Sequence, residues 1–398
     1  MLKCGTAVDA HDKLPPNRLA NSHQQSDDPD SGKYHRFLLC QRKRRRREQN
    51  NGLKGRMDFI ILREFPPANV ERMWRDCLTH VEFPSHFNAP EYFLVPLWEG
   101  KGPFAVLALD GESVAGIVTG LHVGSEVSCG VASRPQISVD PGKDVAAALD
   151  ALASGLLAAS GAAELITVYT WSSLELPAFA AHGFRRRELE GSVVLDLTLG
   201  SEALFKQFSK DRRRNIRFAE KNGIEVTLAT TPEDIAAAYE VYVAWRQTDR
   251  KTVQGETSTF EVFDRSAHLA NRRMFLARLS GKVIAINIFR FFPGGLFESA
   301  ANNSLDEFLH LKPNELLQWR GIEWACQQGL RRHSLGGAHQ FLLRFGGTVV
   351  PISRYRRDRT WMRKHDVRET VQDLSRKALK KMPPSVAKTV RRALGKDT

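Results

Sequence analysis

The sequence lacks several patterns that mark well-defined protein classes. Its five cysteines among 398 residues are scattered, odd in number and never spaced as Cys-x-x-Cys, so neither a disulfide framework nor a zinc site is expected. No apolar run approaches the roughly 20 residues that a membrane-spanning helix needs, and residues 1–30 hold no apolar segment typical of a secretory signal. Walker loops, metal clusters and Ser-His-Asp patterns are not discernible. These absences predict a metal-free protein of the cytoplasm.

The net charge of +13 is concentrated at the two ends of the chain. Residues 1–56 hold 13 Lys+Arg against 6 Asp+Glu, and residues 365–398 hold 9 against 4, which leaves 36 against 35 for residues 57–364. A DNA-binding body needs a basic face of its own. No DNA partner is therefore expected, although a nucleic-acid-associated protein acting through basic termini is an alternative.

The basic ends invite different interpretations. Residues 1–56 are polar and carry a run of basic residues at 42–47, a composition that favours disorder. Because Met57 directly precedes an apolar strand pattern, we expect it to be the true start and the leader to be dispensable or untranslated. Residues 365–398 alternate apolar and cationic positions. They predict either an amphipathic helix on the inner face of an anionic membrane or a solvated C-terminal helix.

Residues 57–200 alternate between the periodicities of strands and helices. Helices are predicted at 68–80 and 144–159, and a short one ends at the turn His182-Gly183-Phe184. Extended segments are predicted at 58–63, 104–109, 113–122, 135–139, 165–169 and 192–197. This order predicts the α/β (α+β) class, with a mixed twisted sheet covered by helices.

The second half of the chain repeats this layout. Residues 109–115 align without gaps with residues 279–285, since each segment is a strand, a tight glycine turn and a second strand. The helix that ends at Gly161 corresponds to the helix Pro313–Gln328, which ends at Gly329. The offsets, 170 and 168, agree closely enough to indicate one duplication. We therefore predict two tandem domains, 57–200 and 227–364.

The segment 201–226 between the halves reads as a linker helix. Leu204, Phe208, Ile216 and Ala219 fall at helical spacings, and Gly223 stands where a helix would end. The basic residues also recur at three- and four-residue spacing and can share one face, where they bind an anion or are simply solvated. They are Lys210, Arg213, Arg214 and Arg217.

Three motifs in family order resemble Fem-type transferases and the related acyltransferases of polysaccharide biosynthesis. They are the linker segment 204–223 with its Asn215-Ile216-Arg217, the helical segment 313–329, and the segment 335–347 with its two Gly-Gly pairs. Those proteins consist of two GNAT-like domains in tandem. The resemblance therefore implies two tandem GNAT-like domains here, although the first half agrees in layout only.

The resemblance also implies a function. We expect direct N-acyl or aminoacyl transfer, in a GNAT-type cleft, to an amino group of a cell-envelope saccharide or peptide precursor. The donor would be acyl-CoA (acetyl-CoA) or aminoacyl-tRNA, and the acceptor would be nucleotide- or lipid-linked. In GNAT domains, backbone N–H groups at a helix start hold the donor's pyrophosphate, which points to Lys312, Pro313, Asn314 and Glu315. The loop Asp140-Pro141-Gly142-Lys143 is the equivalent place in the first half, and the basic face of the linker would hold the acceptor's diphosphate.

The candidate catalytic residues lie in the second half. Glu298 ends a probable strand and is a candidate general base, with His339 and His333 as alternatives. Arg344 is the cation nearest to the place where the family usually has a lysine.

The chain departs from the family pattern at two of these positions. Leu342 stands in place of that lysine, and Ser334 in place of an aspartate. The long helical arm that some Fem proteins insert is missing as well. A catalytically inert tandem GNAT scaffold is therefore a further alternative.

Overall fold

The computed structural model describes residues 57–131, 136–171, 174–248, 257–338 and 340–381. The predictions made for the leader 1–56 and for residues 382–398 therefore lie outside the described residues. Among the described residues, no helix combines the length and the apolar character that crossing a bilayer requires.

The first half forms the strands and helices that the periodicities predict, with one short strand in addition, β4. The largest difference is at β7, which begins at Arg185 and not at residue 192. The elements are β1 (Asp58–Leu62), α2 (Ala68–His80), β2 (Gly102–Asp110), β3 (Ser113–Val123), β4 (Glu126–Cys129), β5 (Ile137–Val139), α3 (Val145–Ser160), β6 (Leu165–Trp171), α4 (Pro177–Ala181) and β7 (Arg185–Asp196).

The second half repeats the order of the first. Its hairpin β9–β10 corresponds to β2–β3, and α9 corresponds to α3. The elements are α5 (Ser201–Gln207), α6 (Lys210–Lys221), β8 (Ile224–Leu228), α7 (Pro232–Arg246), α8 (Phe260–Ala267), β9 (Arg272–Leu279), β10 (Lys282–Phe291), β11 (Leu296–Ser304), α9 (Pro313–Gln327), β12 (Arg332–Gly337), α10 (Gln340–Leu343), β13 (Thr348–Asp358) and α11 (Lys364–Lys381).

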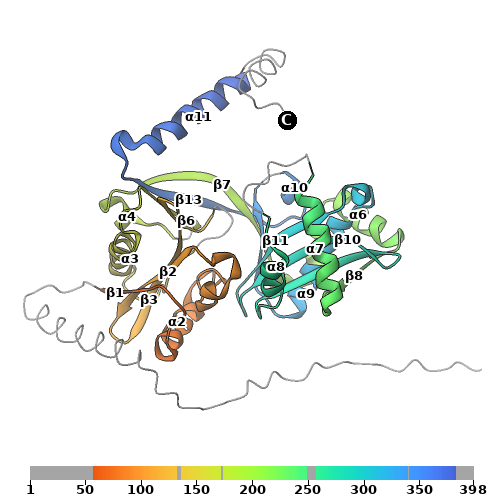
Figure 1. Cartoon of the computed structure of the whole chain (residues 1–398), viewed down its shortest axis with the longest axis horizontal. Helices are drawn as coiled ribbons and strands as arrows, with labels where there is room; N and C mark the ends of the chain where they lie inside the picture. Colours follow the sequence, from red (N-terminus) through yellow and green to blue (C-terminus); the bar gives the residue numbers. More distant parts are fainter. Residues whose placement is uncertain (1–56, 132–135, 172–173, 249–256, 339, 382–398) are drawn as a thin grey trace, which may run out of the picture. The chain divides into compact units, whose positions relative to one another are not determined.

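The two halves share one sheet. In the described part of the chain, 13 strands are joined in the order β1-β2-β3-β4-β6-β13-β7-β12-β11-β10-β9-β8, and β5 pairs with β3. Most neighbours are antiparallel, whereas β4–β6 and β11–β12 are parallel. The mixed sheet covered by helices is as predicted (Figure 1).

The last strands of the two halves are exchanged. β13 comes from the second half but lies between β6 and β7, with Tyr355 opposite both Val168 and Arg186. In turn, β7 comes from the first half but pairs with β12, where His333 lies opposite Leu195. A hydrophobic cluster crosses this junction and contains Phe83, Trp171, Val194, Leu296 and Ile352.

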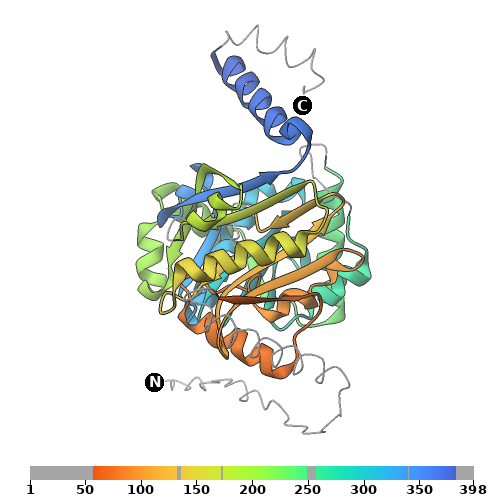
Figure 2. The ribbon, with the colours of Figure 1, turned by 90° about the vertical axis from the view of Figure 1, so that its left-hand side faces the viewer.

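Helices cover both faces of the sheet. In the second half, alternate residues of β9 point to opposite faces: Phe275 and Ala277 belong to the core under α9 and α6, whereas Met274 and Leu276 belong to the core under α7. In the first half, α3 packs on one face of β2 and β3 and α2 contacts β3 (Figures 1 and 2). The core therefore consists of layers on either side of one sheet.

The predicted single linker helix is wrong, because the segment forms two helices. Phe208 is extended (ψ 144°) and closes α5, and the Ser209 hydroxyl then accepts a hydrogen bond from the Arg212 amide and caps α6. Phe208 is 1% exposed and packs against Trp319 and Phe345. Its burial in this aromatic cluster outweighs the continuation of the helix.

The turn into β13 requires glycine. Gly347 has φ +86°, and a Cβ there would lie 2.6 Å from the carbonyl oxygen of Val194. We expect Gly347→Ala to lower the free energy of unfolding by about 3 kcal/mol or more, since it combines left-handed strain with overpacking. Gly329→Ala is the matched control: Gly329 also has positive φ (+67°) but has open space around it, so we expect a cost of only about 1–2 kcal/mol. Urea unfolding of both variants measures the difference, and equal costs would contradict the close approach of β13 to β7.

Candidate functional site

The strands β11 and β12 part from each other near Glu298. They pair only from Leu296 to Glu298, opposite Arg332 to Ser334. Beyond that point β12 follows β7, whereas β11 continues along β10. A bulge accompanies the parting, because Ala300 lies between two paired residues of β11 and has no Cα partner on β10. In the antiparallel ladder with β10, alternate residues of β11 then turn their main-chain groups toward the side that β12 has left.

The helix α9 begins beside this stretch of β11. Its N-cap, Lys312, is in the left-handed region (φ 64°), Pro313 follows at the first helical position, and no side chain caps the first turn. The side chain of Asn314 donates a hydrogen bond to the Ser304 hydroxyl at 3.0 Å, which ties the helix start to the end of β11. Uncapped N–H groups at a helix N-terminus favour an anion. Lys312, Pro313 and Asn314 thus lie at an uncapped helix start, and the binding of a donor there stays a prediction.

Glu315, predicted to lie with these residues, faces elsewhere. It is 9% exposed, and its Oε1 lies 3.0 Å from Nη1 of Arg212 and accepts a hydrogen bond from Asn215 Nδ2 at 3.3 Å. The carboxylate of Glu315 thus neutralises a buried cation on α6. We assign Glu315 to the packing of α9 on α6 and not to a ligand.

Arg212 is a central residue that the sequence reasoning missed. Its side chain is 2% exposed and lies over the rings of Phe341 and Phe345, with Cζ at 4.1 and 4.3 Å from their centroids. Its Nη2 donates to the Phe341 carbonyl at 3.1 Å. Burial lowers the pKa of Arg212, an effect that Glu315 opposes and that the charge of Arg344 reinforces. Arg212 thereby joins all three sequence motifs, on α6, on α9 and around α10.

The four basic residues predicted to bind the acceptor do not act as one group. Nη1 of Arg213 donates to the carbonyls of Lys206 and Phe208, at 2.6 and 2.9 Å, and so holds the end of α5. The other three are exposed: Arg217 lies over the ring of Phe205, Arg214 pairs with Asp211, and Lys210 begins α6. Arg213 is thus structural, and acceptor binding by the rest stays a prediction.

Glu298 meets a histidine from the first half of the chain. It is 3% exposed, and its Oε1 lies 3.4 Å from Nδ1 of His86, which is 1% exposed. The loop that carries His86 reaches β11 because the Leu296 amide donates to the Pro84 carbonyl at 2.8 Å. Arg344 is exposed, on the turn after α10, where its carbonyl accepts from the Ser209 amide. His339 lies outside the described residues.

A buried chain of polar side chains runs beneath α9. Ser299 Oγ donates to Asn287 at 2.8 Å, Asn287 donates to Gln318 at 3.2 Å, and Gln318 Nε2 lies 2.5 Å from Nε2 of His333. His333 Nδ1 lies 2.9 Å from the Phe297 carbonyl, to which it donates. Burial lowers the pKa of His333 to about 4, although the Phe297 carbonyl opposes the shift. His333, the alternative catalytic histidine, is therefore neutral and fixed within this chain.

Two buried amide oxygens beside α9 lack a hydrogen-bond donor among the described residues. Asn302 Oδ1 and Asn314 Oδ1 are buried and form no hydrogen bond with any described residue. Asn302 and Ser304 are two apart on β11, so their side chains point to the same face, and Ser304 contacts Asn314. A buried acceptor without a partner is costly. Both oxygens thus remain acceptors without a donor among the described residues.

The equivalent loop of the first half differs in charge. Asp144 caps α3 by accepting from the Ala147 amide at 3.0 Å, and Asp140 accepts from the Gly142 amide at 2.8 Å. Lys143 turns away to Asp110, at 3.4 Å. Two carboxylates thus occupy the place where a pyrophosphate would lie, and the structure does not favour an anion at this loop.

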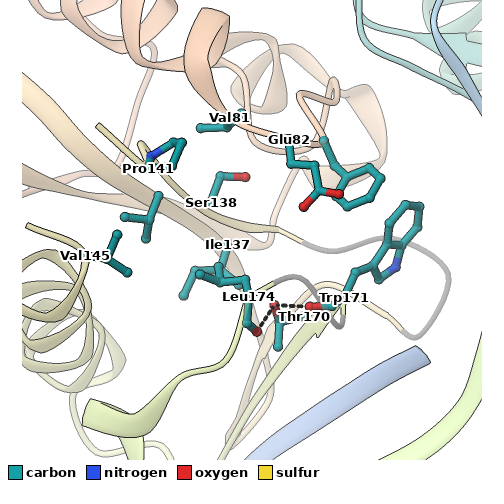
Figure 3. A pocket seen from close by; sticks show the side chains of 11 residues that line it. Val81, Glu82, Ile137, Ser138, Pro141, Val145, Thr170, Trp171 and Leu174 are labelled. Carbon is teal, nitrogen blue, oxygen red and sulfur yellow. Dashed lines mark hydrogen bonds between the residues drawn. The ribbon is translucent and has the colours of Figure 1, made fainter. Parts of the chain in front are cut away.

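A cavity lies beside that loop. Its volume is about 240 Å³, and most of its lining is apolar, with Pro141 and Val145 on one side and Trp171 on the other (Figure 3). The carboxylate of Glu82 is the charged group among the labelled side chains. This cavity suits an apolar group better than a phosphate.

The pKa of His333 predicts how stability depends on pH. The folded histidine titrates near pH 4, while the unfolded chain takes up its proton near pH 6.5. The contribution of His333 to the free energy of unfolding is therefore complete above about pH 6.5. It decreases as the pH falls toward 4, and the loss reaches about 3 kcal/mol at the low end. We expect His333→Gln to remove this pH dependence of the free energy of unfolding. His310→Gln, at an exposed position, should keep it. Urea unfolding between pH 7 and pH 4, referred to the wild type, tests both, and an unchanged slope in His333→Gln would contradict the neutral assignment.

Residues 206–346 match the family model described as an acetyltransferase (GNAT) domain. No curated protein sequence matches the chain. Among solved structures, FemX aligns with a TM-score of 0.56 and 14% identity over 72% of this chain and 95% of FemX. A conserved protein of unknown function from Bacteroides thetaiotaomicron aligns with a TM-score of 0.50 and 12% identity over 75% of this chain and 99% of that protein.

A third solved structure also aligns with the chain. It is a tandem GNAT protein from the clavulanic acid biosynthesis pathway, which aligns with a TM-score of 0.49 and 14% identity over 77% of this chain and 99% of its own. At such identities the structural likeness speaks for the fold alone. The predicted tandem GNAT-like fold is confirmed, and residues 206–346 match the acetyltransferase (GNAT) domain model.

Proposed function

We propose that the second half of the chain transfers an acyl or aminoacyl group to an amino group of a cell-envelope saccharide or peptide precursor. One observation supports this most directly: the match to an acetyltransferase domain covers the parting of β11 from β12, the uncapped start of α9 and the two amide oxygens without partners. A helix start suits a diphosphate, and the amide oxygens suit the N–H groups of an extended donor.

Acyl-CoA is the donor that fits these groups. The diphosphate of coenzyme A would lie at the start of α9 with Lys312 as its cation, and the amide N–H groups of its pantetheine arm would reach Asn302 and Asn314. Aminoacyl-tRNA, which the Fem-type resemblance implies as the other donor, is the second candidate. The equivalent helix start of the first half is less suited to a diphosphate, because Asp140 and Asp144 already accept hydrogen bonds from its backbone N–H groups.

The chemistry requires an acceptor amine in its neutral form. The amine nitrogen attacks the donor carbonyl carbon, the bond from that carbon to the thiol or ester oxygen breaks, and one proton passes from nitrogen to the leaving group. We assign Glu298 as the base that takes this proton, since it lies where β11 and β12 part. His86, from the other half, holds the carboxylate in place as a positioning residue.

We propose that the acceptor's diphosphate binds on the exposed face of α6. Lys210, Arg214 and Arg217 are exposed on α6 and remain our candidates for its diphosphate. Arg213 is left out because its guanidinium is engaged by backbone carbonyls.

Glu298→Gln tests the base. We expect kcat to fall by about 10²- to 10⁴-fold, because the amide cannot accept the proton, while KM for the donor stays nearly the same. Glu225→Gln, at an exposed position of β8, is the matched control and should keep wild-type kinetics. Turnover is followed with a panel of acyl-CoAs, charged tRNAs and amine-bearing envelope precursors. If Glu298→Gln turns over like the wild type, Glu298 is not the base; if the wild type turns over no donor, the chain is an inert scaffold.

Asn314→Ala tests the donor site separately from the chemistry. Losing one hydrogen bond to the donor should raise KM, or the Kd measured by calorimetry, by about 2- to 10-fold and leave kcat close to wild type. Asn222→Ala, where Asn222 lies on the exposed end of α6, is the control, and urea unfolding checks that both variants are folded. An unchanged affinity for acyl-CoA in Asn314→Ala would argue against this donor site.

A further inference from the structure

The helix α11 extends from the end of β13, and much of it stands clear of the other elements (Figures 1 and 2). It begins at Lys364, directly after the short helix Trp361–Arg363. Trp361 and Met362 are 87% and 68% exposed, the two most exposed large apolar residues described. Such exposure of a tryptophan is unusual for a surface that meets only water.

One face of α11 is acidic and holds the helix to the sheet. Glu369 lies 2.6 Å from both Arg187 and Arg354 and 2.5 Å from Arg356. Asp373 also pairs with Arg187. Burial raises the pKa of Glu369, but its bonds and charge interactions with Arg354, Arg356 and Arg187 outweigh this effect and hold the pKa below its ordinary value. This face is therefore committed to the arginines of β7 and β13.

The opposite face of α11 is apolar and exposed. Val367, Val371 and Leu374 are 53%, 56% and 61% exposed. At about 100° per residue, positions 367, 371 and 374 share one side, roughly opposite positions 366, 369 and 373. The attachment of the acidic face thus fixes which way the apolar face points, away from the sheet.

The ion pairs also separate the charges of the C-terminal segment. Residues 365–398 contain 9 Lys+Arg and 4 Asp+Glu, and three of those four acids, Asp366, Glu369 and Asp373, pair with arginines. The described carboxylates of the segment are thus engaged in ion pairs, whereas Arg368, next to Val367, is exposed. An apolar stripe with cations beside it matches an anionic bilayer in both apolar character and charge.

We propose that α11 together with Trp361 and Met362 docks this protein on an anionic lipid surface. The apolar stripe and Trp361 enter the interfacial region of the bilayer, and Arg368, together with the net positive charge of residues 365–398, attracts the acidic headgroups. This inference rests on α11 and its ion pairs and is independent of the transfer reaction proposed above.

The test is co-sedimentation of the full chain with vesicles of phosphatidylcholine alone or with about 30% phosphatidylglycerol. We expect binding to the anionic vesicles only, weakened at least about 10-fold in about 0.5 M NaCl because the contribution of the cations is screened. The double variant Val371→Glu with Leu374→Glu should lower vesicle binding by more than about 10-fold. Val123→Glu, at a residue of β3 that is 55% exposed, is the matched control and should bind like the wild type.

Three outcomes would overturn the proposal. Binding that does not depend on lipid charge removes the role of the cations, and wild-type binding by the double variant removes the role of the apolar stripe. Self-association of the wild type in sedimentation velocity, lost in the double variant without any vesicle binding, would assign the stripe to a second copy of the chain. Because the substitutions lie on exposed residues, circular dichroism should show all variants folded.

Discussion

The pairing of β7 with β12 and of β13 with β7 is the constraint on which the rest of the structure depends. It joins the two halves into one sheet, so that each half completes its strand order with a strand from the other. It also holds β12 on the side of β7 while β11 continues along β10, and the bulge at Ala300 turns β11 further from β12. The open edge of β11, beside the candidate site, is thus a consequence of the exchange. The glycine at 347 belongs to the same constraint, since β13 passes β7 too closely for a side chain.

A buried cation organises the second half around this edge. Arg212 would be costly to bury alone, and only the nearby carboxylate of Glu315, two aromatic rings and a backbone carbonyl make its position tolerable. Because these partners come from α9 and from the segment around α10, the ion pair sets the position of α9 relative to α6. The start of α9, and with it Lys312 and Asn314, follows from that packing.

The two halves have the same layout but opposite electrostatics at equivalent helix starts. In the first half Asp140 and Asp144 satisfy the backbone N–H groups themselves, and the neighbouring cavity is mostly apolar. In the second half no side chain caps α9, a lysine precedes it, and amide oxygens lie unsatisfied beside it. The two halves thus keep the same element order but differ in the charges at their helix starts. His86 of the first half lies beside Glu298 of the second, the residue that we propose as the base.

The sequence by itself determined the elements that depend on local periodicity. Apart from β4, the strands and helices of the first half could be predicted, and so could the helix start at Pro313, because alternation and helical spacing express short-range physics. The break of the linker at Phe208 was not readable, since it depends on burial among distant aromatic rings. Nor could the sequence distinguish Arg212, which is buried and paired, from Arg214, which is exposed, within one run of arginines.

Only the tertiary structure decided three further features. They are the exchange of β7 and β13, the partners of Glu298 and Glu315, and the direction in which α11 presents its apolar face. Each of them depends on contacts between residues far apart in the chain, and local sequence patterns do not predict such contacts.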